Sequence, residues 1–108
     1  MPGQARHGPT PVAGRRRALL RLYVAGASPN SALALANLEA LLAGPLAGRC
    51  ELEVIAVFAS PERALLDRVL VTPTLVKRAP GAPCRILGTL RDPGQVLRAL
   101  GLAQELVP

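Results

Sequence analysis

The stretch ALLRLYVAG at residues 18–26 and the tetrapeptide SPNS at residues 28–31 decide the fold of this 108-residue chain. An apolar run of this length with a single charge predicts a strand that is buried on both faces. Ser28 then provides a side-chain cap, and Pro29 favours the first helical position. Leucines recur at helical spacing up to Gly44, so the sequence predicts a helix over residues 29–43. Its apolar face is formed by Leu35, Leu38, Leu41 and Leu42.

The next segment repeats this alternation of strand and helix. Residues 50–58 (CELEVIAVF) predict a second strand. It runs parallel to the first, because a strand, a helix and a strand of these lengths form a right-handed crossover. Ser60 followed by Pro61 repeats the cap signal and predicts a shorter helix. The apolar side chains of that helix are Leu65, Leu66 and Val69.

The C-terminal part predicts a β-hairpin and a last helix. Pro73 precedes a β-branched run and belongs at a strand entrance, because a central strand cannot hold proline in its middle. A turn over residues 80–83 joins this strand to another over residues 84–88. Asp92 opens the final helix, with Gln95 placed for a capping box. The predicted order is βαβαββα, an α/β fold with a mixed four-stranded sheet and three helices.

The net charge of +6 is concentrated at the N-terminus. Four arginines and no acid precede Ala18, whereas nine basic residues face seven acidic ones from Ala18 onward. Residues 1–17 are also rich in proline and glycine, which predicts a disordered, solvated basic leader. A nucleic-acid-binding arm is the less favoured alternative, because Phe58 and Tyr23 are the only aromatic residues available for stacking. One domain over residues 18–103 and a short tail over residues 104–108 complete the expected organisation.

The chain carries no pattern of a membrane segment, a metal site or a disulfide. No apolar run approaches bilayer length and the N-terminus lacks a signal-peptide pattern, so a cytoplasmic protein is expected. Cys50 and Cys84 stand 34 positions apart without a CxxC or metal-ligand spacing, and His7 is the only histidine. We therefore expect two free thiols that serve packing rather than redox sensing, and no cofactor.

The predicted order is that of thioredoxin-like proteins, and TPTL at residues 72–75 resembles the segment where these proteins place a cis-proline. By spacing, the redox CxxC motif of that fold would fall on residues 28–31, where Ser28 and Ser31 replace both cysteines. A serine nucleophile would need a base, and this part of the sequence holds no histidine or lysine. Ser28 is therefore interpreted as a helix cap, and no enzymatic activity is expected. A thioredoxin-fold redox protein stays open as an alternative.

At a finer level the chain resembles the KaiB family, the small partner of the KaiC ring ATPase in the cyanobacterial circadian oscillator. The resemblance rests on LRLYVAG at residues 20–26, SPNS at residues 28–31 and TPTLVK at residues 72–77, and it extends through ILG at residues 86–88. It implies a non-enzymatic protein of circadian or stress-related signalling that binds a hexameric KaiC-type ATPase. KaiA, or a SasA-like kinase as competitor, is a further implied partner. The SasA input domain is similar, but this chain is too short to carry a kinase.

The resemblance also implies a choice between two folds. Family members that keep time interconvert between a tetrameric ground state, with the order βαββααβ, and a thioredoxin-like monomer that binds KaiC. The segment after Pro73 is rebuilt between them, which makes Pro73, Gly88 and Thr89 candidate determinants of the fold. Thr89 stands where the family commonly has an acidic residue, Ala56 replaces an aspartate, and the tail is short. These differences predict the thioredoxin-like state here, while self-association as a dimer or tetramer stays open.

A partner-binding surface is expected near the start of the first helix and around the hairpin. Its candidate residues are Pro29, Asn30, Lys77, Arg78 and Arg85. Successive strand residues point to opposite faces, so at most one of Lys77 and Arg78 faces a buried layer. The alternative for either residue is a solvated sheet edge, where basic side chains discourage strand pairing.

Overall fold

The computed structural model of the chain describes residues 17–79 and 83–101. The predicted leader, apart from Arg17, lies outside these residues. So do most of the predicted turn over residues 80–83 and the tail over residues 104–108.

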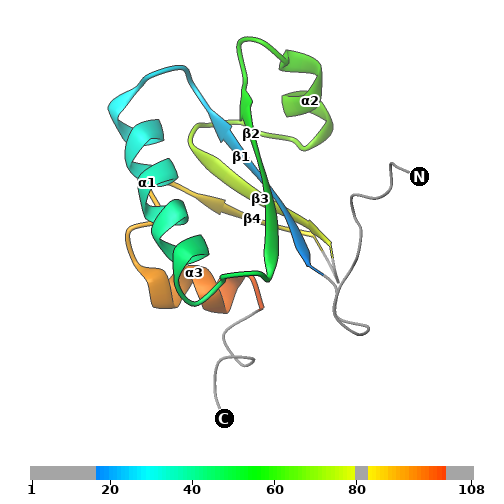
Figure 1. The fold of residues 1–108 in the computed structure, drawn as a ribbon. Helices are drawn as coiled ribbons and strands as arrows, with labels where there is room; N and C mark the ends of the chain where they lie inside the picture. Colours follow the sequence, from blue (N-terminus) through cyan, green and yellow to red (C-terminus); the bar gives the residue numbers. More distant parts are fainter. Residues whose placement is uncertain (1–16, 80–82, 102–108) are drawn as a thin grey trace, which may run out of the picture.

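Strands and helices of the described residues follow the predicted order βαβαββα, not the alternative βαββααβ (Figure 1). The elements are β1 (Ala18–Val24), α1 (Pro29–Ala43), β2 (Cys50–Ala56), α2 (Pro61–Leu66), β3 (Thr74–Ala79), β4 (Cys84–Leu87) and α3 (Pro93–Ala99). Strand β1 pairs in parallel with β2 and antiparallel with β3, which pairs antiparallel with β4. The mixed sheet has the order β2-β1-β3-β4, so β1 and β3 are internal strands.

Helix α1 has the predicted bounds, and side-chain hydrogen bonds fix its start. The Ser28 hydroxyl oxygen accepts a hydrogen bond from the Ser31 backbone N–H (3.3 Å), and Pro29 begins the helix. The Ser31 hydroxyl oxygen accepts in turn from the backbone N–H of Ala25 (3.0 Å), which ties the helix start to the end of β1. Ser28 is therefore a helix cap, as predicted.

The two faces of the sheet are covered differently (Figure 1). Helices α1 and α3 cover one face, and the main core lies beneath them. Its buried side chains include Leu20, Leu22, Leu38, Leu75, Val96 and Leu100. A smaller cluster of Tyr23, Ile55 and Val76 lies on the other face, beside α2. The predicted burial of β1 on both faces is confirmed in its second half, whereas Leu19 near its start is 43% exposed.

Strand β2 is shorter than predicted. It ends at Ala56 and not at Phe58, because the chain turns there through a hydrogen bond from the Ala59 backbone N–H to the Ala56 carbonyl (3.0 Å). The apolar end of the predicted strand therefore leaves the sheet, and Phe58 is 81% exposed.

Two predictions about helix α2 are wrong. Ser60 occupies the position before the helix, but its side chain makes no capping hydrogen bond. The predicted helix also includes Val69, whereas α2 contains only Leu65 and Leu66 of the three, and these are 78% and 79% exposed. The helix ends at Leu66, and Val69 packs against the sheet from the following segment.

The C-terminal elements follow the prediction. Pro73 stands directly before β3, after a cis Thr72–Pro73 peptide bond. Strands β3 and β4 form the hairpin, and the Asp92 carboxylate accepts a hydrogen bond from the Gln95 backbone N–H (3.2 Å) to begin α3. Within residues 17–79 and 83–101, every helix is too short or too polar to cross a bilayer.

Candidate functional site

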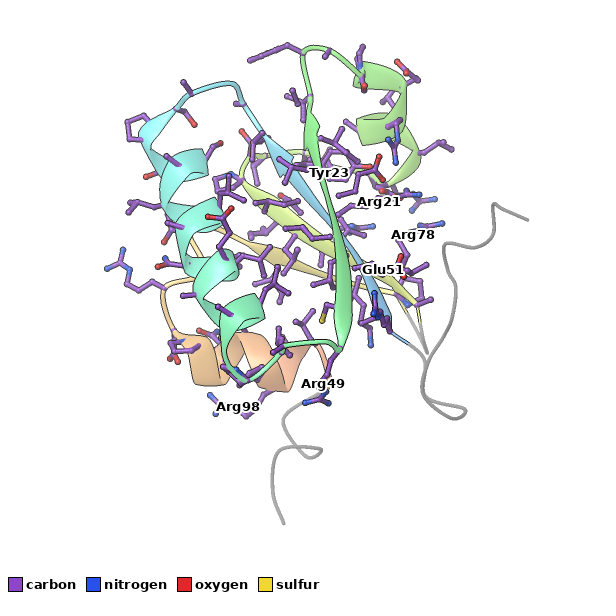
Figure 2. All side chains as sticks on the ribbon, in the orientation of Figure 1. Arg21, Tyr23, Arg49, Glu51, Arg78 and Arg98 are labelled. Atoms are coloured by element: carbon purple, nitrogen blue, oxygen red, sulfur yellow. The ribbon has the colours of Figure 1, made fainter. Side chains whose placement is uncertain are left out.

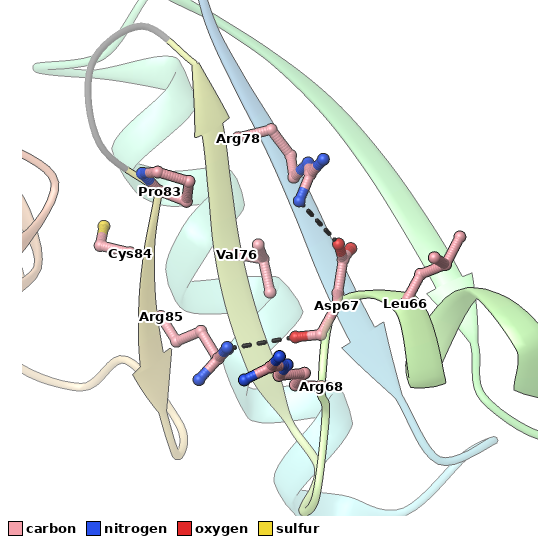
Figure 3. A pocket seen from close by; sticks show the side chains of 8 residues that line it. All are labelled: Leu66, Asp67, Arg68, Val76, Arg78, Pro83, Cys84 and Arg85. Atoms are coloured by element: carbon pink, nitrogen blue, oxygen red, sulfur yellow. Dashed lines mark hydrogen bonds and ion pairs between the residues drawn. The ribbon is translucent and has the colours of Figure 1, made fainter.

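A buried carboxylate, Asp67, joins the end of α2 to the sheet (Figure 3). Its Oδ2 accepts hydrogen bonds from the Tyr23 hydroxyl and from Arg21 Nη1 (3.0 Å), both on β1. Its Oδ1 accepts from Arg78 Nη1 on β3 (3.0 Å). The backbone carbonyl of Asp67 accepts from Arg85 Nε on β4 (3.1 Å). One residue thus binds three strands to the segment after α2.

The surroundings of Asp67 keep its carboxylate ionised. Burial, with only 1% of the side chain exposed, would raise its pKa. Hydrogen bonds from Tyr23 and Arg21 and the charges of Arg21 and Arg78 outweigh burial, so the pKa lies below its ordinary value. Burial and the bond to Asp67 raise the pKa of the Tyr23 phenol. At neutral pH the pair is therefore a neutral phenol that donates to a charged carboxylate.

An exposed ion pair holds the other side of α2. Arg63 donates to both carboxylate oxygens of Glu53 on β2, at 2.6 and 2.7 Å, and this bidentate contact lowers the pKa of Glu53. Arg21 Nε lies 3.8 Å from the same carboxylate. In Figure 2 the labelled Arg21, Tyr23 and Arg78 all lie on the α2 side of the sheet. Because the Arg63–Glu53 pair faces water, it contributes less to stability than the buried Asp67.

Beside Asp67 lies an open cavity of about 320 Å³ (Figure 3). Arg68, Arg78 and Arg85 line it from three different elements, and Asp67 is the one acid among its lining residues. Leu66 and Val76 form an apolar part of the cavity lining. The cavity therefore combines positive charge with an apolar side.

The structure brings Arg78 and Arg85 together, as the predicted partner surface requires. Both hydrogen bond to Asp67 and both line the cavity. Pro29 and Asn30 are exposed at the start of α1, the helix that covers the opposite face, and they do not join this group. The five candidates thus fall into separate places on the molecule.

Lys77 points away from Arg78, as strand alternation predicts. Its side chain is buried (9% exposed), and its ammonium group donates to the Leu100 carbonyl after α3 (2.9 Å). The alternative of a solvated basic edge is wrong for both residues, because β3 lies between β1 and β4.

Backbone groups of all three candidate determinants of the fold form hydrogen bonds. The Gly88 N–H donates to the Pro73 carbonyl (3.0 Å), which joins the end of β4 to the entrance of β3. The carbonyl of Thr89 accepts from the Asn37 side chain of α1 (2.8 Å). Gly88 has a φ of +99°, a conformation that side chains of L-residues rarely adopt. The segment after the hairpin is therefore fixed to both the sheet and α1.

The two cysteines do not form a disulfide with each other. Cys50 and Cys84 are both free, and burial raises the pKa of the Cys50 thiol. A raised pKa disfavours the reactive thiolate. Among the described residues, no three side chains of metal-binding type gather.

An exposed apolar surface surrounds α2. We call it the α2 apolar surface, and it consists of Phe58, Leu65, Leu66, Leu70 and Val71, whose exposed fractions range from 51% to 92%. Exposed apolar groups that lie close together commonly mark a binding surface. Sequence reasoning missed this surface and Asp67, although one signal was present. Residues 57–71 hold more apolar side chains than a six-residue helix can turn inward.

Comparison with known sequences gives matches over most of the chain. A family model described as the KaiB domain matches residues 21–102. The circadian clock oscillator protein KaiB of Prochlorococcus marinus (strain MIT 9211) is 43% identical over 91 residues, which cover 84% of this chain and 80% of the relative. The protein of the same name from Synechococcus sp. (strain RCC307) is also 43% identical over 91 residues, covering 84% and 83%.

Solved structures with the same fold include the N-terminal domain of Synechococcus elongatus SasA. It aligns with a TM-score of 0.67 and 31% identity over 87% of this chain and 92% of that domain. Chloroplastic thioredoxin z aligns with a TM-score of 0.68 over 84% of this chain and 81% of its own. Its identity is 22%, so this likeness shows the thioredoxin-like fold alone.

Proposed function

The chain belongs to the KaiB family of circadian clock proteins, and we propose from this that it acts by binding a KaiC-type ring ATPase, without catalysis of its own. The observation that carries the proposal is the family match over residues 21–102, which spans nearly the whole sheet and all three helices. Ser28 and Ser31, at the positions of the thioredoxin cysteines, are engaged in helix capping and backbone hydrogen bonds. This supports a binding role over redox chemistry.

The α2 apolar surface is the proposed contact for the ATPase. Covering Phe58 or Leu70, which are 81% and 92% exposed, would remove a large apolar area from water. Leu66 belongs both to this surface and to the wall of the cavity that Arg78 and Arg85 line. The partner surface that fits is therefore apolar at its centre with acidic groups at one side.

Two of the three remaining predicted contacts form a second candidate surface. Pro29 and Asn30 are exposed and available at the start of α1. Lys77 would have to release the Leu100 carbonyl before its ammonium group could reach a partner. We therefore place the main contact at α2 and treat the α1 start as the competing location.

The proposed role is modulation of a daily rhythm or a stress response in the cytoplasm. A SasA-like kinase with a similar N-terminal domain would compete for the same ATPase, and KaiA would be a further partner. The thioredoxin-like arrangement would be the binding-competent form, and conversion to another fold would remove the α2 apolar surface as it stands. Fold switching is thus part of the proposal.

Size-exclusion chromatography with the KaiC-type ATPase of the same genome, in the presence of ATP, tests this function. We expect the chain to co-elute with the ATPase hexamer and the variant Leu70→Glu to lose at least tenfold in affinity. Leu33→Glu, at an apolar residue of α1 that is 52% exposed, is the matched control. Substitutions at such exposed positions change stability little, so both variants should keep the wild-type melting temperature.

Each outcome of that experiment has a distinct meaning. Loss of binding in Leu70→Glu alone supports the α2 apolar surface. Loss in Leu33→Glu alone moves the contact to α1. An absence of co-elution by the wild-type chain would contradict the proposed function.

A further inference from the structure

The cavity beside Asp67 has the charge and the donors of an anion-binding site. Arg68 follows α2, Arg78 belongs to β3 and Arg85 belongs to β4, so their guanidinium groups reach the cavity from three elements (Figure 3). Three arginines against one aspartate give the lining a formal charge of +2. An open, mixed-polarity cavity of about 320 Å³ is large enough for a small ligand.

The single acid of the cavity has its oxygens occupied. Asp67 accepts from Arg21 and Tyr23 on one carboxylate oxygen and from Arg78 on the other, and its side chain is only 1% exposed. Arg21 compensates the carboxylate charge from outside the cavity lining. The field of the cavity is therefore set by its arginines.

Donor groups remain available after the internal bonds are made. Arg85 uses Nε for the Asp67 carbonyl, and its two terminal nitrogens make no other bond within the described part of the chain. The side chain of Arg68 makes no hydrogen bond or ion pair to any described residue. Guanidinium groups present planar pairs of N–H donors that match the oxygens of phosphate and carboxylate groups.

The backbone of Arg68 is an independent sign that this side chain has a role. Arg68 has a φ of +56° at the position just beyond the end of α2. The bonds Arg68 N–H to Leu65 O (3.1 Å) and Val69 N–H to Ala64 O (2.9 Å) close the turn, a geometry in which glycine is usual. A residue with a side chain is strained in this conformation, and such strain concentrates at functional sites.

We propose that this cavity binds a small phosphate-bearing anion. Three guanidinium groups from three directions suit a tetrahedral group with several acceptor oxygens better than a planar carboxylate with two. The site adjoins the proposed ATPase contact and shares Leu66 with it, but its ligand is a small molecule. Its test does not use the ATPase, so the two proposals fail independently.

Titration of the ¹⁵N-labelled full chain with inorganic phosphate, followed by NMR at constant ionic strength, tests the site. We expect saturable shifts of backbone amides near Arg68, Arg78 and Arg85, and no saturable shifts with sodium acetate. Absence of saturation with phosphate, or equal binding of acetate, would overturn the proposal.

Two variants that each remove one positive charge distinguish specific binding in the cavity from nonspecific attraction of phosphate to a basic protein. Arg68→Gln is expected to weaken phosphate binding roughly tenfold, since a hydrogen bond to a charged group is commonly worth that factor or more. Arg91→Gln removes one charge from an exposed residue outside the cavity and should leave the affinity unchanged. Equal weakening by both variants would mean that only net charge matters and would also overturn the proposal.

Two further probes identify the source of the phosphate. Pyrophosphate and ADP are titrated in the same way. Tighter binding of ADP than of pyrophosphate indicates a nucleotide ligand, whereas equal or weaker binding indicates a free phosphate or polyphosphate. Either result supports a ligand that carries phosphate. If neither probe binds although inorganic phosphate saturates the site, the ligand is inorganic phosphate itself.

Discussion

Asp67 is the residue on which the α2 side of the sheet depends, because donors from three strands converge on it. Tyr23, Arg21 and Arg78 bond to its carboxylate and Arg85 bonds to its carbonyl. Without the carboxylate charge, Arg78 would lose its counter-ion, Arg21 would keep only the more distant Glu53, and the Tyr23 hydroxyl would keep only the Arg63 carbonyl as a strong acceptor. The energetic consequence is larger than for an exposed ion pair, although both arginines keep partial access to water.

Asp67→Asn is expected to lower the free energy of unfolding by about 2–3 kcal/mol. Urea denaturation measures this change. Asp92→Asn is the control, because asparagine caps a helix as well as aspartate does and the Asp92 cap is exposed. Equal stability of Asp67→Asn and wild type would show that the buried carboxylate contributes nothing.

The pH dependence of stability should carry the signature of the same residue. The pKa of Asp67 is lowered in the fold, so the unfolded chain binds its proton more readily. The contribution of Asp67 is therefore present above its ordinary value of 3.8 and is lost as the pH falls through the folded pKa. Tyr23, with its raised pKa, behaves in the opposite way: its contribution is present below 10.0 and is lost as the pH rises through its folded pKa. The urea concentration at the unfolding midpoint should fall at acid pH in the wild type. In Asp67→Asn this fall should be much smaller.

Arg68→Gly should stabilise the protein while it removes a cavity-lining side chain. Glycine relieves the strain of the +56° φ, so we expect a gain of about 1 kcal/mol, which corresponds to about 4–8 °C in melting temperature. Differential scanning calorimetry measures it. A lower melting temperature would contradict this, because it would mean that the Arg68 side chain stabilises the fold by more than its backbone strain destabilises it.

Among the elements, the segment from the hairpin to α3 decides which arrangement the C-terminal half adopts. Gly88 and Pro73 share a backbone bond, and Thr89 is bonded to Asn37 of α1. These contacts belong to the thioredoxin-like arrangement. Weakening them should favour any competing packing of the same chain.

Gly88→Ala is expected to cost about 1–2 kcal/mol of stability, because the φ of +99° disfavours any side chain. Open space surrounds the added Cβ, so the cost would come from the backbone and not from a clash. Gly94→Ala, in the first turn of α3, is the matched control: its added Cβ would lie 3.2 Å from the end of the exposed, flexible Arg98 side chain, which can move aside, so this variant should be close to neutral. Chemical denaturation of both variants decides the matter, and equal effects would rule out backbone strain at Gly88.

The sequence predicts elements well where their signals are local. The bounds of α1 follow from Ser28, Pro29 and Gly44, which lie at its own ends. Helix α2 was predicted in place but too long, since Val69 lies beyond its end at Leu66 and packs against the sheet from the following segment. The Asp67 cluster could not be predicted, since its partners stand up to 46 positions away. Strand alternation separated Lys77 from Arg78, yet only the sheet order shows which of them is buried.

The whole molecule is a thioredoxin-like scaffold, for which we propose a role as a binding module. Its main core is closed by α1 and α3, and α2 leaves apolar side chains in water on the other side. Two packings of one chain can coexist only when they differ by about a few kcal/mol. The bonds of Asp67, Gly88 and Thr89 together favour the packing described here, so the free protein should populate the binding-competent form.

The most direct measurement is the rate at which the chain forms a complex with the KaiC-type ATPase of the same genome, with ATP present. Samples taken over minutes and over many hours are separated by size-exclusion chromatography. We predict a complex within minutes, because no refolding needs to precede binding. A complex that appears only after hours would contradict a preformed thioredoxin-like state, and no complex on either timescale would contradict the proposed function itself.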